Sequence, residues 1–278
     1  MTDILQYDFF RNALAGLLII SVASALIGTY IVSRRLVALC GGITHACFGG
    51  LGLGYFLGIS PLLMAGVFAV GSTAGVEWLS SRQNMREDSA IAVVWSLGMA
   101  LGILFVFMTP GYVPELTTFL FGNVLTITRS DLIAFALFTV VLLIFFALFY
   151  RMIVACAFDR DFALVSNLPV RFINYTMTVL VAVCIVLTIR LVGIMLLMSM
   201  LTLPQLCAEV FTNRFPRLMA LSALFSVLAS AGGLFAATLV DVPCSALIVV
   251  AMVSLYVVAR IAKALSRNIS RSKAVKQK

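Results

Sequence analysis

Residues 132–150 read LIAFALFTVVLLIFFALFY, an apolar run without a charged side chain. As a helix, a run of about 20 residues matches the hydrocarbon core of a bilayer, which is about 30 Å thick. Within lipid every backbone amide must be paired inside the protein, so a span is either a helix or a strand of a closed barrel. Because this run is long and continuous and does not alternate over about ten residues, it predicts a transmembrane helix.

The whole chain has the same character as this run. It has 278 residues, of which 63% are hydrophobic and only 11% are charged. A soluble domain carries about 25% charged residues, because its exposed surface must be rich in them. The composition therefore excludes a soluble fold. It predicts an all-α membrane protein, a polytopic helical bundle that forms a single transmembrane domain over residues 1–278.

Apolar runs separated by short polar clusters mark the predicted spans. The nine spans lie at about 9–32, 36–57, 61–79, 89–108, 132–150, 172–189, 191–212, 218–240 and 243–261. The first run continues to Val32 and ends at Arg34 and Arg35, a flank typical of a retained span and not of a cleaved leader. The least distinct break is at Arg190, and fusing the two runs beside it would give eight spans.

Positive charge orients these spans. If the connection at Arg34 and Arg35 is cytoplasmic, alternation places sixteen of the 19 basic residues in the cytoplasm. The three that remain outside are Arg11, Arg129 and Arg190. The positive-inside rule therefore favours nine spans with the N-terminus outside and the C-terminus inside, since eight spans would export the basic tail 262–278. That tail would face the anionic cytoplasmic leaflet, which accounts for the net charge of +8 without a nucleic acid partner.

The second span carries a stripe of small residues. Gly42, Ala46, Gly50 and Gly54 recur every four residues, so they lie along one face of a helix. Small side chains on such a face let the backbone of another helix approach closely. The stripe predicts tight helix packing in this part of the bundle.

His45 is the only histidine of the chain and lies in the same span. An ionisable group at membrane depth is costly and is a functional candidate by default. Neutral imidazole is also a common ligand of transition metals. A metal pathway at His45, with Thr44, Cys40 and Cys47 as neighbouring donors, is therefore one interpretation, and a satisfied hydrogen bond between helices is the other.

Two carboxylates interrupt other apolar runs. Glu77 lies in the third span and Glu209 in the seventh. Either is a candidate buried polar group. Either could instead extend toward the interface or pair with Arg82 or Arg214 at the helix end.

The sequence contains no constellation typical of an enzyme. It has neither clustered carboxylates at metal-ligand spacing nor a set of nucleophile, base and acid. A G-x-x-x-x-G-K-[ST] phosphate loop is absent, since the first lysine of the chain is Lys263. The chain is therefore expected to be a transport subunit without an ATPase motif and without a permanently bound cofactor. ATP hydrolysis, if it drives transport, would occur on another polypeptide.

Residues 151–171 form a connection that is too long for a simple turn. It contains the short, charged and amphipathic stretch FDRDFA at 158–163, and it ends at Asn167 and Pro169, which stop a helix. This pattern predicts a surface helix that could contact a cytoplasmic partner.

Several short motifs occur in order along the chain. They are RR at 34–35, GITHA at 42–46, REDSAI at 86–91, LFGNVL at 120–125, FDRDFA at 158–163, VG to LP over 192–204, and DVP at 241–243. With these motifs the chain resembles, from about residue 10 to 261, the inner-membrane permeases of ATP-binding-cassette importers for zinc, manganese and iron. The resemblance implies the fold of a type II importer permease.

The resemblance also implies partners and roles. Two copies of the permease would form one pathway in a bacterial cytoplasmic membrane, and an extracytoplasmic protein would deliver a divalent metal ion as the transported substrate. Cytoplasmic ATP-binding subunits would dock on Asp159, Arg160, Asp161, Phe162 and Ala163. Their closure would drive alternating access around His45.

The chain departs from this family at one position. The family usually carries an aspartate four residues before the histidine, one helical turn away, and this chain has Gly41 there. His45 would then act with its symmetry mate, with Cys40 or Cys47, or with backbone carbonyls. A set of thiol and imidazole donors suits zinc or iron better than manganese, which favours oxygen.

Two other functions compatible with these features stay open. The first is a secondary metal-ion carrier or channel that needs no ATPase, and flux without ATP in liposomes would favour it. The second is the same importer architecture carrying a metal chelate. A membrane scaffold without transport is a third reading, and it predicts that substitutions at His45 are silent.

Overall fold

The structure is a computed structural model that describes residues 6–83, 85–111, 121–122, 124–158, 160–240 and 242–276. Its helices are α1 (Asp8–Ser33), α2 (Val37–Leu57), α3 (Pro61–Arg82), α4 (Glu87–Met108), η2 (Val124–Thr126), α6 (Arg129–Phe158), α7 (Arg160–Val165), α8 (Val170–Phe211), α9 (Phe215–Val240) and α10 (Cys244–Lys276). Within these residues nine segments are long and apolar enough to cross a membrane, because α8 contributes two. The predicted all-α bundle of nine spans is confirmed.

A backbone break at Gly193 divides α8. This glycine has φ 74° and ψ 173°, a region that residues with a Cβ avoid. Gly122 packs against the break, and a Cβ added to it would lie 2.9 Å from Cα of Val192. The two candidate spans of α8 are Val170–Ile189 and Leu191–Phe211, and Gly193 is the third residue of the second. The eight-span alternative is therefore wrong, because α8 holds two segments that are each long and apolar enough to cross a membrane, with a backbone break close to their boundary.

A proline interrupts the second half of α8. Pro204 has no N–H, so the carbonyl of Met200 loses its normal helical donor. The buried side chain of Gln205 compensates, since its Nε2 donates to the carbonyls of Met200 at 3.5 Å and of Ser24 in α1 at 3.2 Å. Gly28 leaves room for this amide, because a Cβ there would lie 2.7 Å from Cδ of Gln205. The proline break is thus tied to α1.

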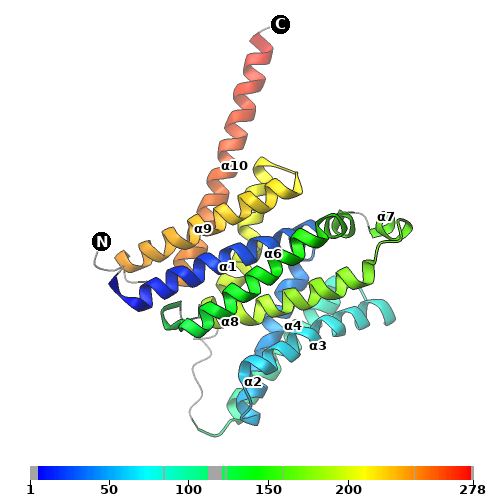
Figure 1. Ribbon diagram of the computed structural model, residues 1–278, viewed down its shortest axis with the longest axis vertical. Helices are drawn as coiled ribbons and strands as arrows, with labels where there is room; N and C mark the ends of the chain where they lie inside the picture. Colours follow the sequence, from blue (N-terminus) through cyan, green and yellow to red (C-terminus); the bar gives the residue numbers. More distant parts are fainter. Residues whose placement is uncertain are drawn as a thin grey trace.

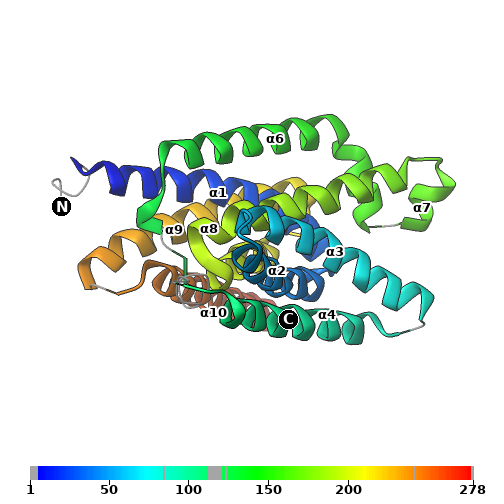
Figure 2. The same ribbon diagram turned by 90° about the horizontal axis from the view of Figure 1, so that it is seen from below.

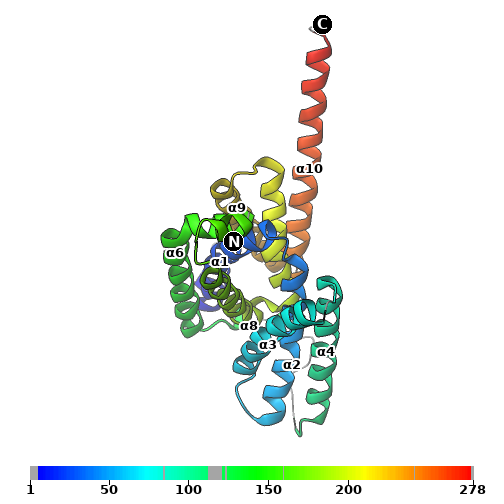
Figure 3. The same cartoon turned by 90° about the vertical axis from the view of Figure 1, so that its right-hand side faces the viewer.

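Two groups of helices make up the bundle. α1 packs against α6, α8 and α9, and α10 packs against α8 and α9. Figure 2 shows α6, α1 and α8 running alongside one another. α2 packs mainly against α3 and α4, and these three helices lie together at the bottom of Figure 3. The connection between the groups is made by α8, which contacts both α2 and α3.

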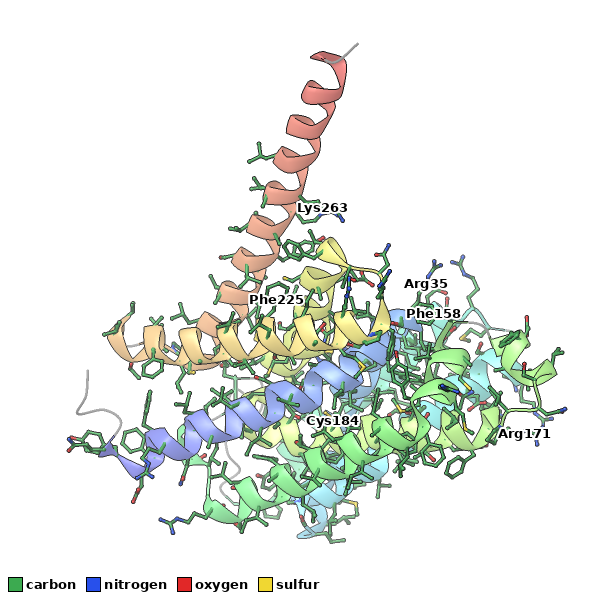
Figure 4. The ribbon with its side chains drawn as sticks, turned by 45° about the horizontal axis from the view of Figure 1, so that its top comes forward. Arg35, Phe158, Arg171, Cys184, Phe225 and Lys263 are labelled. Atoms are coloured by element: carbon green, nitrogen blue, oxygen red, sulfur yellow. The ribbon has the colours of Figure 1, made fainter. Side chains whose placement is uncertain are left out.

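The last turns of α1, α3 and α6 lie at the same end of the bundle as the first turns of α2, α4, α8 and α9. Arg34 hydrogen-bonds across α6 and α8 there, Ser80 and Glu87 line one cavity with Arg34, and the rings of Phe158 and Phe215 are 6.0 Å apart. We call it the arginine-rich end. Figure 4 shows Arg35, Phe158 and Arg171 at this end.

The C-terminal part of α10 extends well beyond the other helices (Figure 1). Before it leaves the bundle, the ammonium of Lys263 donates to the carbonyl of Val210 near the end of α8, and Figure 4 shows this side chain beside α8. Orphan carbonyls at a helix C-terminus are favourable partners for a cation. The contact fixes α10 against α8 at this level.

Glycine in α4 sets the spacing between α4 and α2. A Cβ added to Gly98 would lie 2.8 Å from Cβ of Ala46, closer than real Cβ atoms approach. We expect Gly98→Ala to lower the stability of the purified protein by about 1–3 kcal/mol, because the overpacked helices must separate. Thermal unfolding in detergent measures this change.

The matched control is Gly232→Ala in α9, where an added Cβ meets no atom within 4 Å. Alanine is a better helix former than glycine by about 1 kcal/mol, so this variant should be neutral or stabilised. Equal melting temperatures for the two variants would contradict the close approach of α2 and α4.

Candidate metal pathway and coupling surface

His45 lies on the side of α2 that faces α4. Its ring stacks on the indole of Trp95 with centroids 4.4 Å apart and an angle of 7° between the planes. The imidazole is half-buried, and its Nδ1 is buried with no hydrogen-bond partner among the described residues. A buried imidazole nitrogen without a partner leaves a donor or acceptor unsatisfied, and a ligand or water would satisfy it.

The neighbouring donors of α2 do not share this face. At about 100° per residue, Cys40 lies about 140° and Cys47 about 160° around the helix from His45. Cys40 instead lines a cavity described below, and Cys47 is fully buried in the core. The hydroxyl of Thr44 donates to the carbonyl of Cys40 at 2.8 Å. One helix therefore cannot present these thiols and His45 to the same ion.

The position one turn before His45 is filled by a thioether. A Cβ added to Gly41 would lie 2.8 Å from Cε and 3.7 Å from Sδ of Met198 in α8. A side chain at this position would have to displace the end of Met198. The thioether of Met198 in α8 is therefore a soft donor that lies against α2 one turn before His45.

The small-residue stripe of α2 lies against two different helices. An added Cβ would lie 2.6 Å from Cγ2 of Ile91 at Gly42, and Ala46 lies against Gly98, so the first half of the stripe meets α4. At Gly50 an added Cβ would lie 2.6 Å from the carbonyl carbon of Met64, and at Gly54 2.5 Å from Cα of Pro61. The second half thus meets α3. The stripe fixes where His45 sits relative to both neighbours.

A cavity of about 470 Å³ opens between α1, α2, α3 and α8 at the arginine-rich end. Its polar and charged lining includes Arg34, Cys40, Glu77, Glu87 and Asn174. His45 does not line it. Cys40 is therefore separated from His45 and lies with the charged groups of this cavity.

Glu77 and Glu209 are exposed rather than buried. Both lie in the last two turns of their helices, at the arginine-rich end, where a long side chain reaches past the apolar surface. Of the two interpretations, the one that makes them buried polar groups at membrane depth is therefore wrong, and their exposure agrees with side chains that extend toward the interface. Glu77 belongs to the lining of the cavity.

α7 is the short helix expected between spans five and six. It ends in a Schellman turn, because the N–H of Leu168 bonds to the carbonyl of Ala163 at 3.0 Å and that of Asn167 to Leu164 at 3.1 Å. Asn167 has φ 54°, the left-handed conformation that this turn requires. Ala163 is fully buried while Phe162 is 61% exposed, so one face anchors α7 and another, about 100° around the helix, presents an aromatic ring.

The other residues predicted for this surface are Asp159, Arg160 and Asp161. Asp161 is exposed. Asp159 lies outside the described residues, and so does Asp241 of the late DVP motif. The backbone of Arg160 begins α7.

Within the described residues, no group of three or more histidine, cysteine, aspartate or glutamate side chains could hold a metal ion. The residues that sequence reasoning missed are Trp95, Met198 and Arg34. Trp95 and Met198 stand in apolar runs and give no local signal, because only the packing of α4 and α8 on α2 brings them to His45 and Gly41. The sequence singled out Arg34 only as a topological charge and as part of the RR motif, which do not reveal its contacts with α6 and α8.

The sequence of this chain is similar to those of known membrane proteins. The model of the ABC 3 transport family matches residues 6–263. The chain is 36% identical over 229 residues to a probable metal transport system membrane protein of Chlamydia pneumoniae, covering 80% of this chain and 78% of that protein. It is 30% identical over 260 residues to the manganese transport system membrane protein MntC of Halalkalibacterium halodurans, covering 92% and 88%.

A solved structure has the same fold. PsaBC from Streptococcus pneumoniae, determined in complex with Fab, superposes with a TM-score of 0.84 at 26% identity, covering 93% of each chain. A family match over almost the whole length, with this superposition, establishes the assignment. The chain belongs to the ABC 3 transport family and is a multi-pass membrane permease of the metal-transporting ATP-binding-cassette importers.

Proposed function

We propose that this chain is the subunit through which an ATP-driven importer moves divalent transition-metal ions across the bacterial cytoplasmic membrane by alternating access. The observation that carries the proposal is His45. It is the only imidazole of the chain, it sits inside the bundle, and its Nδ1 has no partner among the described residues. Ionisable groups at membrane depth mark substrate pathways, and a pathway ligand must bind its ion weakly enough to release it.

Two copies of the chain would complete the pathway, and ATP-binding subunits would dock on α7. In support, α7 presents Phe162 outward from an anchor at Ala163, as a docking ridge requires. The arginine-rich end would then be cytoplasmic, as the positive-inside rule demands. An extracytoplasmic metal-binding protein would deliver the ion to the opposite end.

The donors near His45 favour a borderline or soft metal. Imidazole suits zinc and iron, and a thioether is a soft ligand, whereas manganese prefers oxygen. Met198 stands at Gly41, where the family usually places a carboxylate. Zinc or iron(II) is therefore the expected substrate, although a relative is named for manganese.

Reconstitution with the cognate ATP-binding subunits and binding protein tests this function. We expect ATP hydrolysis to be stimulated by zinc and iron(II) more strongly than by manganese. Met198→Ala should reduce the difference in stimulation between zinc or iron(II) and manganese, because it removes the soft donor. As a matched control, Met195→Ala removes an exposed thioether three residues away and should leave the order unchanged.

Each competing function predicts a different result. Metal flux without ATP would show a secondary carrier or channel. Stimulation by a metal chelate and not by the free ions would show the same architecture with another cargo. Strongest stimulation by manganese would reject the role given to Met198.

A further inference from the structure

Arg34 differs from its neighbours at the arginine-rich end because its side chain turns into the protein. It is half-buried. The other described arginine side chains there are exposed: Arg35, Arg82, Arg86, Arg151, Arg171, Arg214 and Arg217. An arginine that gives up hydration does so where acceptors replace the lost water.

Its acceptors come from two other helices. Nη1 of Arg34 donates to Oδ1 of Asn174 in α8 at 3.0 Å and to the carbonyl of Cys156 in α6 at 3.2 Å. The same nitrogen lies 3.4 Å from the hydroxyl of Tyr30, and the guanidinium carbon is 5.8 Å from the centre of that ring. The guanidinium is thus held in one place by α1, α6 and α8.

The two acceptors flank α7 in the chain. Cys156 lies in the last turn of α6, whose carbonyls have no helical donors. A cation there also interacts favourably with the negative end of the helix dipole. Asn174 lies in the second turn of α8. α7 makes its main contacts with α6 and α8 as well. A displacement of α7 therefore reaches the rest of the bundle through the two helix ends that Arg34 holds.

The backbone of Arg34 belongs to the joint between α1 and α2. Three hydrogen bonds close this joint, from the N–H groups of Arg34, Arg35 and Leu36 to carbonyls in the last turn of α1, at 2.9–3.0 Å. Arg35 adopts φ 59°, which keeps the turn tight. α2 starts at Val37, directly after the joint, and carries His45 about two turns later. A small change in this joint would therefore move the start of α2, the helix that carries His45.

The cavity next to Arg34 leaves space for such a movement. The cavity of about 470 Å³ lies between α3 and the start of α8, and Arg34 and Asn174 both line it. Close-packed elements transmit small shifts as discrete rearrangements, and an adjoining void lets one of them move.

We propose that Arg34 is a positioning residue that transmits the movement of α7 to α2, so that ATP hydrolysis on the partner is coupled to metal movement at His45. This inference rests on the proposed importer function. Its consequence is specific: without Arg34 the ATP-binding subunits still dock and hydrolyse ATP, but each cycle moves less metal.

The test measures metal uptake and ATP hydrolysis together in proteoliposomes that hold the complete complex, with zinc as the probe. Arg34→Met keeps the length of the side chain and removes every donor. We expect the number of zinc ions moved per ATP to fall about tenfold, while ATP hydrolysis stays within about twofold, as the loss of a charge-assisted hydrogen bond predicts. Arg35→Met is the matched control, since it removes the same charge from an exposed neighbour and should leave the ratio unchanged.

A second pair of variants separates coupling from folding. Asn174→Leu removes one acceptor and should lower the ratio about threefold, and adding it to Arg34→Met should cause no further loss, because both act through one contact. Unchanged ratios in Arg34→Met, or a loss of protein and complex without a change in ratio, would overturn the inference alone. A wild-type complex without ATP-dependent zinc uptake would overturn the proposed function, and the inference with it.

Discussion

His45→Ala should lower metal uptake by the reconstituted importer roughly 10–100-fold at unchanged protein level, the range seen when support of a metal ligand is lost. The side chain is only half-buried, and alanine would remove its ring contact with Trp95. The fold should therefore tolerate the substitution. Uptake of radioactive zinc, normalised to the permease in the liposomes, measures the effect.

His45→Gln distinguishes the two interpretations of this histidine. Glutamine keeps a hydrogen-bonding side chain of similar length but is a much poorer ligand for zinc. If His45 serves transport, His45→Gln should be nearly as slow as His45→Ala. If it only satisfies a hydrogen bond between helices, His45→Gln should restore uptake. Thr44→Val controls for position, since that hydroxyl bonds within its own helix, and it should transport normally.

Ala163→Asp should abolish co-purification of the ATP-binding subunits and reduce ATP-dependent uptake to background. Ala163 is the fully buried anchor of α7, and an aspartate there would place a charge against α6 and α8 without a partner. An unpaired buried charge costs several kcal/mol, more than a six-residue helix gains from its own contacts. α7 should therefore lose its packing against α6 and α8 while the spans remain inserted in the membrane.

Ala163→Ser is the matched control, because it is nearly isosteric and its hydroxyl can bond to a backbone carbonyl. It should retain the partner and most of the uptake. Normal co-purification with Ala163→Asp would show that the ATP-binding subunits dock elsewhere. A loss of permease from the membrane in that variant, with no change for Ala163→Ser, would show that α7 supports insertion and not docking.

The candidate site was predictable only in part. His45 is a candidate from the sequence alone, because an ionisable residue within an apolar run is costly at membrane depth, and its role in transport stays a prediction. Helix geometry alone separates the thiols from His45, since a helix turns about 100° per residue, but only the partner helices decide which face lines a pathway. For Glu77 and Glu209 the sequence left burial and extension toward the interface open, and the structure exposes both because they lie in the last turns of their helices.

The sequence by itself determined that this chain is a membrane protein built of apolar helices and where eight or nine spans lie, and the structure of α8 decided for nine. Span length depends on the thickness of the bilayer, and backbone hydrogen bonds close within each helix, so both are local properties. Only the tertiary structure decided that Met198 fills the space at Gly41, that Trp95 covers His45, and that Arg34 joins α6 to α8. The partners of Arg34 are 122 and 140 residues away along the chain, and no hydrophobic pattern specifies which distant helices pack together.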